Sequence, residues 1–224
     1  PGDFNQDGEI DLAVPHRDGG QSRIFLNDGQ AGFTRTLAFG PPVTNARAAA
    51  AGDLNGDGWL DLVVGDERTG TRVYLNDQHG ALVGGAALGD ATLAPGAIAV
   101  ADMNRDGLAD VVIGHAGAPG ALWFNDGGGS RFTEVRFGDG RGAVYGVAVG
   151  DLNGDGYPDI ATARSDAPNV MFFSSSGVMR AGLQTPAPPQ AAPVLASTRL
   201  APTPPMGFNT WNKFGCNVSE QLIR

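Results

Sequence analysis

Four short stretches of this chain place acidic and amide side chains at the same spacing. The pattern D-x-N-x-D-G-x-x-D occurs at 3–11, 53–61, 102–110 and 151–159, so successive copies start 50, 49 and 49 residues apart. Each copy has oxygen-bearing side chains at positions 1, 3, 5 and 9, a Gly at position 6 for a sharp turn, and a free carbonyl at position 7. Such a set on one flexible loop suits a hard cation, and favours Ca²⁺ over Mg²⁺. Zn²⁺ is not expected, because no Cys or His lies within any loop.

The predicted ligands fall into two groups. The side-chain ligands are Asp3, Asn5, Asp7, Asp11, Asp53, Asn55, Asp57, Asp61, Asp102, Asn104, Asp106, Asp110, Asp151, Asn153, Asp155 and Asp159. The backbone carbonyl ligands are those of Glu9, Trp59, Leu108 and Tyr157. An EF-hand would need a bidentate Glu at position 12, where this chain has apolar residues or Thr. We therefore expect about four Ca²⁺ ions, with a metal-free Asp/Asn/Gly turn as the alternative.

The segments that flank the loops are typical of short β-strands. In the second repeat the apolar runs are Ala48–Ala51, Leu60–Val64, Thr71–Leu75 and Ala81–Ala87, bounded by Gly and polar residues. About fifteen residues after each loop comes an aromatic strand, which three of the four copies follow with Asn-Asp, a hairpin signal. Four antiparallel strands in each radially stacked repeat predict β-propeller blades, and so an all-β fold.

These loops and strands resemble the FG-GAP/VCBS repeats of integrin-α-like propellers and of many secreted bacterial proteins. The resemblance covers residues 1–181 and implies a propeller that commonly has seven blades. Only four loops are present, and no apolar strand precedes the first one. We therefore expect the N-terminus to cut through a blade, with a closed four-bladed ring as the alternative. A blade buries its faces against its neighbours and is not stable alone.

Composition is consistent with a secreted calcium protein. The formal charge is −9, but twelve of the 24 acidic residues are the loop aspartates, whose charge bound Ca²⁺ would largely offset. No basic stripe remains for a nucleic acid. No apolar run reaches the length of a membrane span. Loops of this kind need the calcium of the extracellular space, so we expect secretion.

The character of the sequence changes after residue 181. Seven of the 15 prolines lie between Pro186 and Pro205, and we predict a Pro/Ala-rich linker over residues 182–201. A linker should connect to another domain. The following P-T-P-P-M-G-F-N-T-W-N-K-F-G-C-N-V-S-E resembles the opening of glycoside hydrolase family 27, the α-galactosidases. That resemblance implies that residues 202–224 are the first strand and helix start of a truncated (β/α)8 barrel.

The same resemblance assigns roles to three residues. It implies that Trp211 lies against the galactose ring, and that Phe208, which replaces a Trp of the family motif, contributes an aromatic surface beside it. Cys216 is the sole cysteine and matches one that forms a disulfide in the family, so its partner would be missing here. The family's two catalytic aspartates belong to later barrel strands. We therefore expect no catalytic residue in this chain, and an inactive fragment.

Three functions are compatible with these features. The first is part of a secreted α-galactosidase-like enzyme whose propeller binds polysaccharide or a protein partner, or spaces the catalytic domain. The second is a non-catalytic, calcium-dependent adhesion or lectin-like propeller. The third is another carbohydrate-active enzyme that shares the barrel opening. Aligning the loops also places His16, Asp66, His115 and Arg164 at one equivalent position past the second strand, where they could line a binding surface or be solvated strand ends.

Overall fold

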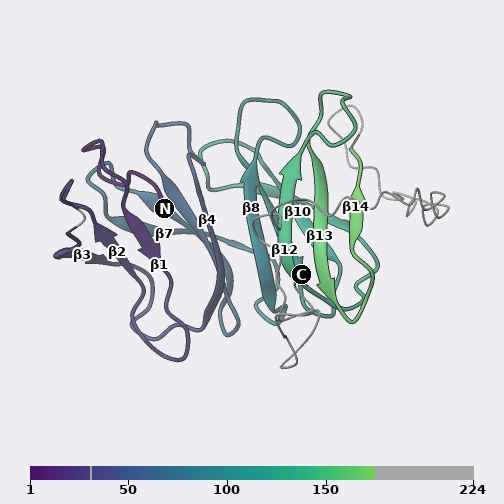
Figure 1. Cartoon of the computed structure of the whole chain (residues 1–224), viewed down its shortest axis with the longest axis horizontal. Helices are drawn as coiled ribbons and strands as arrows, with labels where there is room; N and C mark the ends of the chain where they lie inside the picture. The colour runs from purple at the N-terminus through teal and green to yellow at the C-terminus, as the bar shows by residue number, and fades with distance from the viewer. Residues whose placement is uncertain (31, 175–224) are drawn as a thin grey trace, which may run out of the picture. The chain divides into compact units, whose positions relative to one another are not determined.

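The computed structural model describes residues 1–30 and 32–174, which form 14 β-strands in four antiparallel sheets (Figure 1). No helix occurs among these residues, and hence none long and apolar enough to cross a membrane. The all-β prediction is confirmed for this part of the chain. The four sheets follow one another in chain order, from purple to green in Figure 1.

Each sheet is a meander in which consecutive strands are hydrogen-bonded neighbours. The first sheet contains β1 (Leu12–Val14), β2 (Arg23–Leu26) and β3 (Arg35–Ala38). The second contains β4 (Ala46–Gly52), β5 (Asp61–Asp66), β6 (Gly70–Asn76) and β7 (Leu82–Leu88). The third contains β8 (Pro95–Ala101), β9 (Asp110–His115), β10 (Gly120–Asn125) and β11 (Phe132–Phe137). The fourth contains β12 (Ala143–Gly150), β13 (Asp159–Ser165) and β14 (Val170–Phe172).

The opening strands of the last three sheets share one irregularity. A register shift falls between Ala46 and Ala48 in β4, between Pro95 and Ala97 in β8, and between Val144 and Gly146 in β12. A bulge of this kind bends a strand and increases its twist. β8 lies beside both β4 and β12, so these bent, small-residue strands are where neighbouring sheets approach each other (Figure 1).

The hydrophobic core lies between the sheets and consists of three clusters. One joins the first and second sheets around Phe4 and Leu62, a second joins the second and third sheets around Leu54 and Val111, and a third joins the third and fourth sheets around Met103. The middle residues of β5 and β9 are apolar on both faces, as expected for strands covered on both sides. Each sheet is therefore stabilised mainly by its neighbours.

The strands predicted from sequence in the second repeat are confirmed, with boundaries that move by one or two residues. The predicted run Leu60–Val64 becomes β5 (Asp61–Asp66), and Ala81–Ala87 becomes β7 (Leu82–Leu88). Within residues 1–30 and 32–174, the first sheet has no counterpart of β4, β8 and β12, and an isolated bridge between Gly2 and Asp11 lies at that place. All the described residues belong to one compact unit. The predicted linker and the barrel start at 202–224 lie outside the described residues.

Candidate metal centres in the repeated loops

The four acidic loops occupy equivalent places in the sheets. The loop at 53–61 leads from β4 into β5, the loops at 102–110 and 151–159 join the same strands of the third and fourth sheets, and the loop at 3–11 precedes β1. The Gly at position 6 has a positive φ in every copy, for example +85° at Gly58. Position 4 is also left-handed, even where it is Gln6 or Arg105. Strain of this kind is held only where surrounding contacts fix the loop.

The first aspartate of each loop organises the backbone that follows it. In the second loop, Asp53 Oδ2 accepts the N–H of Gly58 at 2.8 Å, and Oδ1 accepts the N–H groups of Gly56 at 2.7 Å and Asp57 at 3.2 Å. The bond to position 6 recurs in all copies, at 2.9 Å in the other three. These bonds lower the pKa of the Asp151 carboxyl, chiefly through the N–H of Gly156. The first carboxylate of each loop is therefore wrapped by its own loop, and in Asp151 these bonds favour the ionised form.

Positions 3 and 5 are joined side chain to side chain. Asn55 Nδ2 donates to Asp57 Oδ2 at 3.0 Å, and Asn55 Oδ1 accepts the N–H of Asp57. The Asn-to-Asp bond recurs in the other loops. Asp57 Oδ1 also accepts the N–H of Trp59, which together with Gln78 lowers the pKa of the Asp57 carboxyl. Positions 1, 3 and 5 thus gather two carboxyl groups and a carboxamide around one short turn.

The aspartate at position 9 has a second role that the sequence did not reveal. Asp61 is fully buried, and its two oxygens accept the N–H groups of Leu54 and Asn76, each at 2.8 Å. The same pair of bonds forms at Asp11, Asp110 and Asp159. This carboxylate therefore ties the start of the loop to the end of β2, β6, β10 or β14, the strand that follows the one entered from the loop.

Burial makes two of these position 9 carboxylates, those of Asp61 and Asp110, hard to ionise without a compensating charge. Burial raises the pKa of Asp110 to about 6, and repulsion from Asp106 and Asp102 adds to the rise, although two backbone N–H groups oppose it. The pKa of Asp61 is raised for the same reasons. Burial disfavours the charged form of an acid, and a nearby like charge disfavours it further. A cation close to all three carboxylates would remove that repulsion.

The metal ligand set stays a prediction. Within residues 1–30 and 32–174, no group of three or more His, Cys, Asp or Glu side chains is positioned to hold a metal ion. The reason is visible in the second loop. Asp61 is drawn towards Leu54 and Asn76, and Asn55 meets Asp57 through its amide nitrogen.

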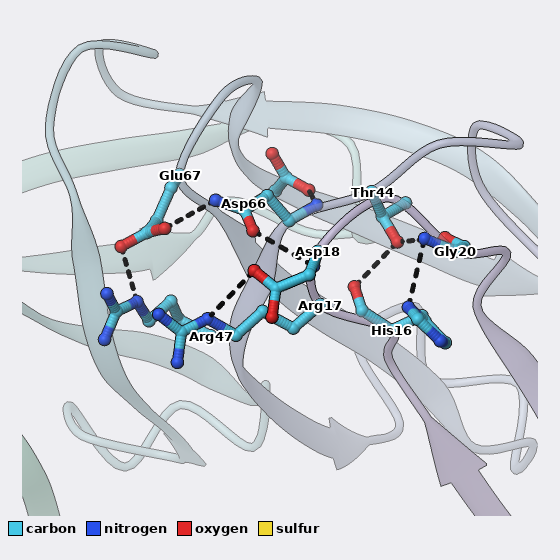
Figure 2. Close-up of polar contacts among 9 residues, drawn as sticks. His16, Arg17, Asp18, Gly20, Thr44, Arg47, Asp66 and Glu67 are labelled. Carbon is cyan, nitrogen blue, oxygen red and sulfur yellow. Dashed lines mark hydrogen bonds and ion pairs between the residues drawn. The ribbon is translucent and has the colours of Figure 1, made fainter.

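The equivalent polar residues past the second strand close turns within their own sheets. His16 Nδ1 accepts the N–H of Gly20, and the hydroxyl of Thr44 donates to the His16 carbonyl (Figure 2). Asp66 accepts N–H groups from residues 45, 68 and 69, and the neighbouring Glu67 pairs with Arg47 (Figure 2).

The last two copies of this position behave in the same way. His115 Nδ1 lies 2.8 Å from the Pro119 carbonyl oxygen, and Arg164 donates to the Pro168 carbonyl and pairs with Asp139. Each of the four side chains therefore has at least one polar atom engaged in a turn. The structure therefore gives no support to the binding-surface hypothesis for this position.

The residues predicted to form the sugar site lie outside the described residues. Trp211 and Phe208, predicted to contact a sugar, and Cys216, predicted to form a disulfide, all belong to that part of the chain.

Tandem antiparallel sheets, each with one acidic loop at the same place, define a β-repeat protein. The family model for the FG-GAP-like repeat matches residues 3–64, 53–113 and 102–162, each match running from one loop through the next. Together these matches cover more than half of the chain, so the chain belongs to the FG-GAP-like repeat family. The resemblance identified from the loops and aromatic strands is confirmed at this level.

A second similarity is short. The chain is 53% identical over 30 residues to an alpha-galactosidase of Cyamopsis tetragonoloba, and 65% identical over 26 residues to alpha-galactosidase A of Cellvibrio japonicus. It is 49% identical over 36 residues to a probable alpha-galactosidase A of Aspergillus clavatus. The matches cover 12–16% of this chain and only 6–7% of each relative. The chain therefore spans less than a tenth of the length of these relatives.

Proposed function

We propose that each of the four loops binds one Ca²⁺ ion. Two lines of structural evidence support this. Positions 1, 3 and 5 lie in mutual contact, with Asp57 held ionised, and the buried Asp61 and Asp110 carboxylates are repelled by the other two carboxylates of their loops. Three carboxylates, a carboxamide and a carbonyl are a donor set that suits Ca²⁺. In the bound loop the cation would replace the Asn55–Asp57 side-chain bond.

The position 9 aspartate would serve the loop in two ways. A carboxylate oxygen has two lone pairs, so an oxygen of Asp61 that accepts one N–H can still reach a cation. The ion would then be linked through Asp61 to β6, and binding would stiffen the whole sheet. Calcium sites of extracellular modules bind in the range of about 10⁻⁴–10⁻³ M. We therefore also propose that the protein works outside the cell.

We further propose that the chain is part of an α-galactosidase-like glycoside hydrolase. The observation that supports this is the identity of up to 65% to α-galactosidases over short segments. We assign those segments to the C-terminal part of the chain that includes residues 202–224, because P-P-M-G-F-N-T-W-N occurs there and in no FG-GAP repeat of the chain. The parent protein would hydrolyse terminal α-D-galactosyl residues, with Trp211 and Phe208 as sugar contacts and Cys216 in a disulfide.

Retaining glycosidases use two carboxylates about 5 Å apart, one as nucleophile and one as acid and then base. The loop aspartates are not candidates for these roles. Asp61 and its equivalents are buried inside the fold and held by backbone N–H groups, and Asp53 is wrapped by its own loop. The role left for the repeat region is to bind a polysaccharide or a protein partner, or to position the catalytic domain.

A non-catalytic adhesion or lectin-like protein is the alternative. One observation favours it: the FG-GAP model accounts for residues 3–162, whereas similarity to α-galactosidases covers at most 16% of the chain. A carbohydrate ligand is compatible with both functions, so ligand binding alone does not separate them.

Hydrolysis of p-nitrophenyl α-D-galactoside distinguishes the α-galactosidase-like function from the non-catalytic one. The protein expressed from the complete reading frame should cleave this substrate, the β-anomer should serve as an inert control, and Trp211→Ala should lose most of the activity. The 224-residue chain alone should be inactive. A complete protein that folds, binds Ca²⁺ and leaves both anomers intact would rule out the α-galactosidase and retain the calcium loops.

A further inference from the structure

The second strand of each of the two middle sheets, β5 and β9, faces two different neighbours in alternation. Leu62 and Val64 of β5 pack with Phe4 in the cluster between the first and second sheets, while Val63 packs with Val111 in the cluster between the second and third sheets. Successive strand residues point to opposite faces. The second sheet therefore has one face for the preceding sheet and one for the following sheet.

The face towards the following sheet includes position 2 of the acidic loop. Phe4 and Leu54 are 0% exposed and Met103 is 2% exposed, because each is covered by the next sheet. The equivalent Leu152 of the fourth sheet is 51% exposed. Leu152 is apolar like its three equivalents, but no sheet among the described residues covers it.

The third strand repeats this contrast. Ile24, Val73 and Leu122 point into the three inter-sheet clusters and are fully buried, whereas the equivalent Met171 of β14 is 49% exposed. Met171 borders an open apolar depression of about 460 Å³. Other residues that line it are Val147, Ala161, Ala163 and Val170. The fourth sheet thus has an exposed apolar face. We call it the trailing face and define it by Leu152, Ala161, Ala163 and Met171.

The first sheet shows the complementary deficiency. Leu12 and Val14 of β1 are 39% and 43% exposed, although their equivalents Leu62 and Val64 are buried. Asn27 differs too. Asn76 and Asn125 each donate from Nδ2 to the position 2 carbonyl of the preceding sheet's loop, whereas Asn27 Nδ2 donates only to Ile10 O within its own sheet. Leu12, Val14 and Asn27 define the leading face.

We propose that the trailing face of one chain docks on the leading face of a second copy of this chain. The proposed contact repeats the interface that already joins the sheets three times within the chain. In it, Met171 and Leu152 would pack on Leu12 and Val14, and Asn27 would donate to the Leu152 carbonyl.

No described residue of the same chain covers the leading or the trailing face. Leu12, Val14, Leu152 and Met171 are all exposed, so the two faces do not cover each other within one chain. Because the faces differ, the contact is heterologous, and it either closes into a ring or extends into a chain of subunits. Two copies with two such contacts would make the closed form.

The oligomeric state of the 224-residue chain tests this proposal. Sedimentation in Ca²⁺ over a wide range of protein concentration should show self-association, and Met171→Glu and Leu12→Glu should each weaken it by about tenfold or more, since each places a charge in an apolar contact. Val83→Glu is the matched control. Val83 is equally exposed but lies on the second sheet, both faces of which are already covered, so this variant should associate like the wild type.

Mixing the two variants identifies the geometry. Met171→Glu retains an intact leading face and Leu12→Glu an intact trailing face, so an equimolar mixture should form one-to-one dimers that neither variant forms alone. A symmetric contact between identical faces would not be rescued. Met171 oxidation by peroxide should also be slower in the wild type than in Leu12→Glu. A wild-type chain that stays monomeric at all concentrations, or association and Met171 oxidation that neither substitution changes, would overturn the proposal.

Discussion

The carboxamide of Asn76 donates to the backbone carbonyl oxygen of Phe4 at 2.9 Å, joining residues 72 positions apart in the chain. Asn76 ends β6 of the second sheet, and Phe4 lies in the acidic loop of the first. Asn76 Nδ2 also reaches the Leu60 carbonyl, and its Oδ1 accepts the N–H groups of Gln78 and Gly80. One buried side chain therefore fastens two acidic loops and a hairpin together.

Replacing Asn76 should loosen the contact between the first two sheets. Asn76→Ala leaves two carbonyls and two N–H groups without their partner, and we expect a loss of about 2–3 kcal/mol in the free energy of unfolding. Asn27→Ala, at the equivalent position without a bond to another sheet, should cost clearly less. Urea unfolding of both variants measures the difference, and equal losses would show that the inter-sheet bond contributes nothing.

Two aspartates of one loop should respond differently to substitution. In Asp61→Asn an amide NH₂ group replaces one acceptor oxygen, so that a hydrogen-bond donor faces a buried backbone N–H. This variant should destabilise the chain even in excess chelator. Asp57→Asn removes a charge that is only half-buried, and should leave the chelated protein nearly unchanged while weakening Ca²⁺ binding. Thermal unfolding of both variants with EDTA and with Ca²⁺ makes the comparison. Equal destabilisation by both in EDTA would refute the division of roles.

His115 should make stability depend on pH below neutrality. Burial lowers the pKa of this imidazole from its usual 6.5. As pH falls through about 6.5, the unfolded chain binds a proton that the folded chain binds only at lower pH, so the folded state loses stability. Between pH 7.5 and pH 5, His115→Gln should lose less unfolding free energy than the wild type. His79→Gln, at an exposed position, should follow the wild type, and a parallel decline in all three would contradict the assignment.

Close approach of the third and fourth sheets should make one glycine irreplaceable. A Cβ at Gly96 of β8 would overlap the backbone carbonyl oxygen of Val144 in β12, which cannot move without shifting its strand. We expect Gly96→Ala to cost about 1–3 kcal/mol. Gly84 of β7 has open space around the same added atom, so Gly84→Ala is the control and should be nearly neutral. Guanidinium unfolding distinguishes them.

The strands could be predicted because their signals are local. The apolar run before Asp66, the aromatic residues before Asn76 and the Gly of each loop act through neighbouring positions. The continuous apolar run Leu62-Val63-Val64 is typical of a strand that is covered on both faces. This run alone indicates that the hydrophobic core lies between the sheets.

The rest depended on partners far apart in the chain. The spacing D-x-N-x-D-G-x-x-D cannot show that Asp61 accepts the N–H of Asn76, or that Asn76 reaches Phe4. The left-handed backbone of Gln6 and Arg105 was missed because glycine is the usual sign of that conformation. The polar position that includes His115 looked like a binding surface from sequence, because the turn that engages it forms only in the folded hairpin.

Calcium titration of the metal-free 224-residue chain by calorimetry tests the central claim most directly. We predict uptake of about four Ca²⁺ ions per chain and a rise in the unfolding temperature that grows with free Ca²⁺, because an ion that binds only the folded state stabilises it. Mg²⁺ at the same concentration should do much less. A folded chain that takes up no Ca²⁺ and unfolds at the same temperature in EDTA would contradict the claim.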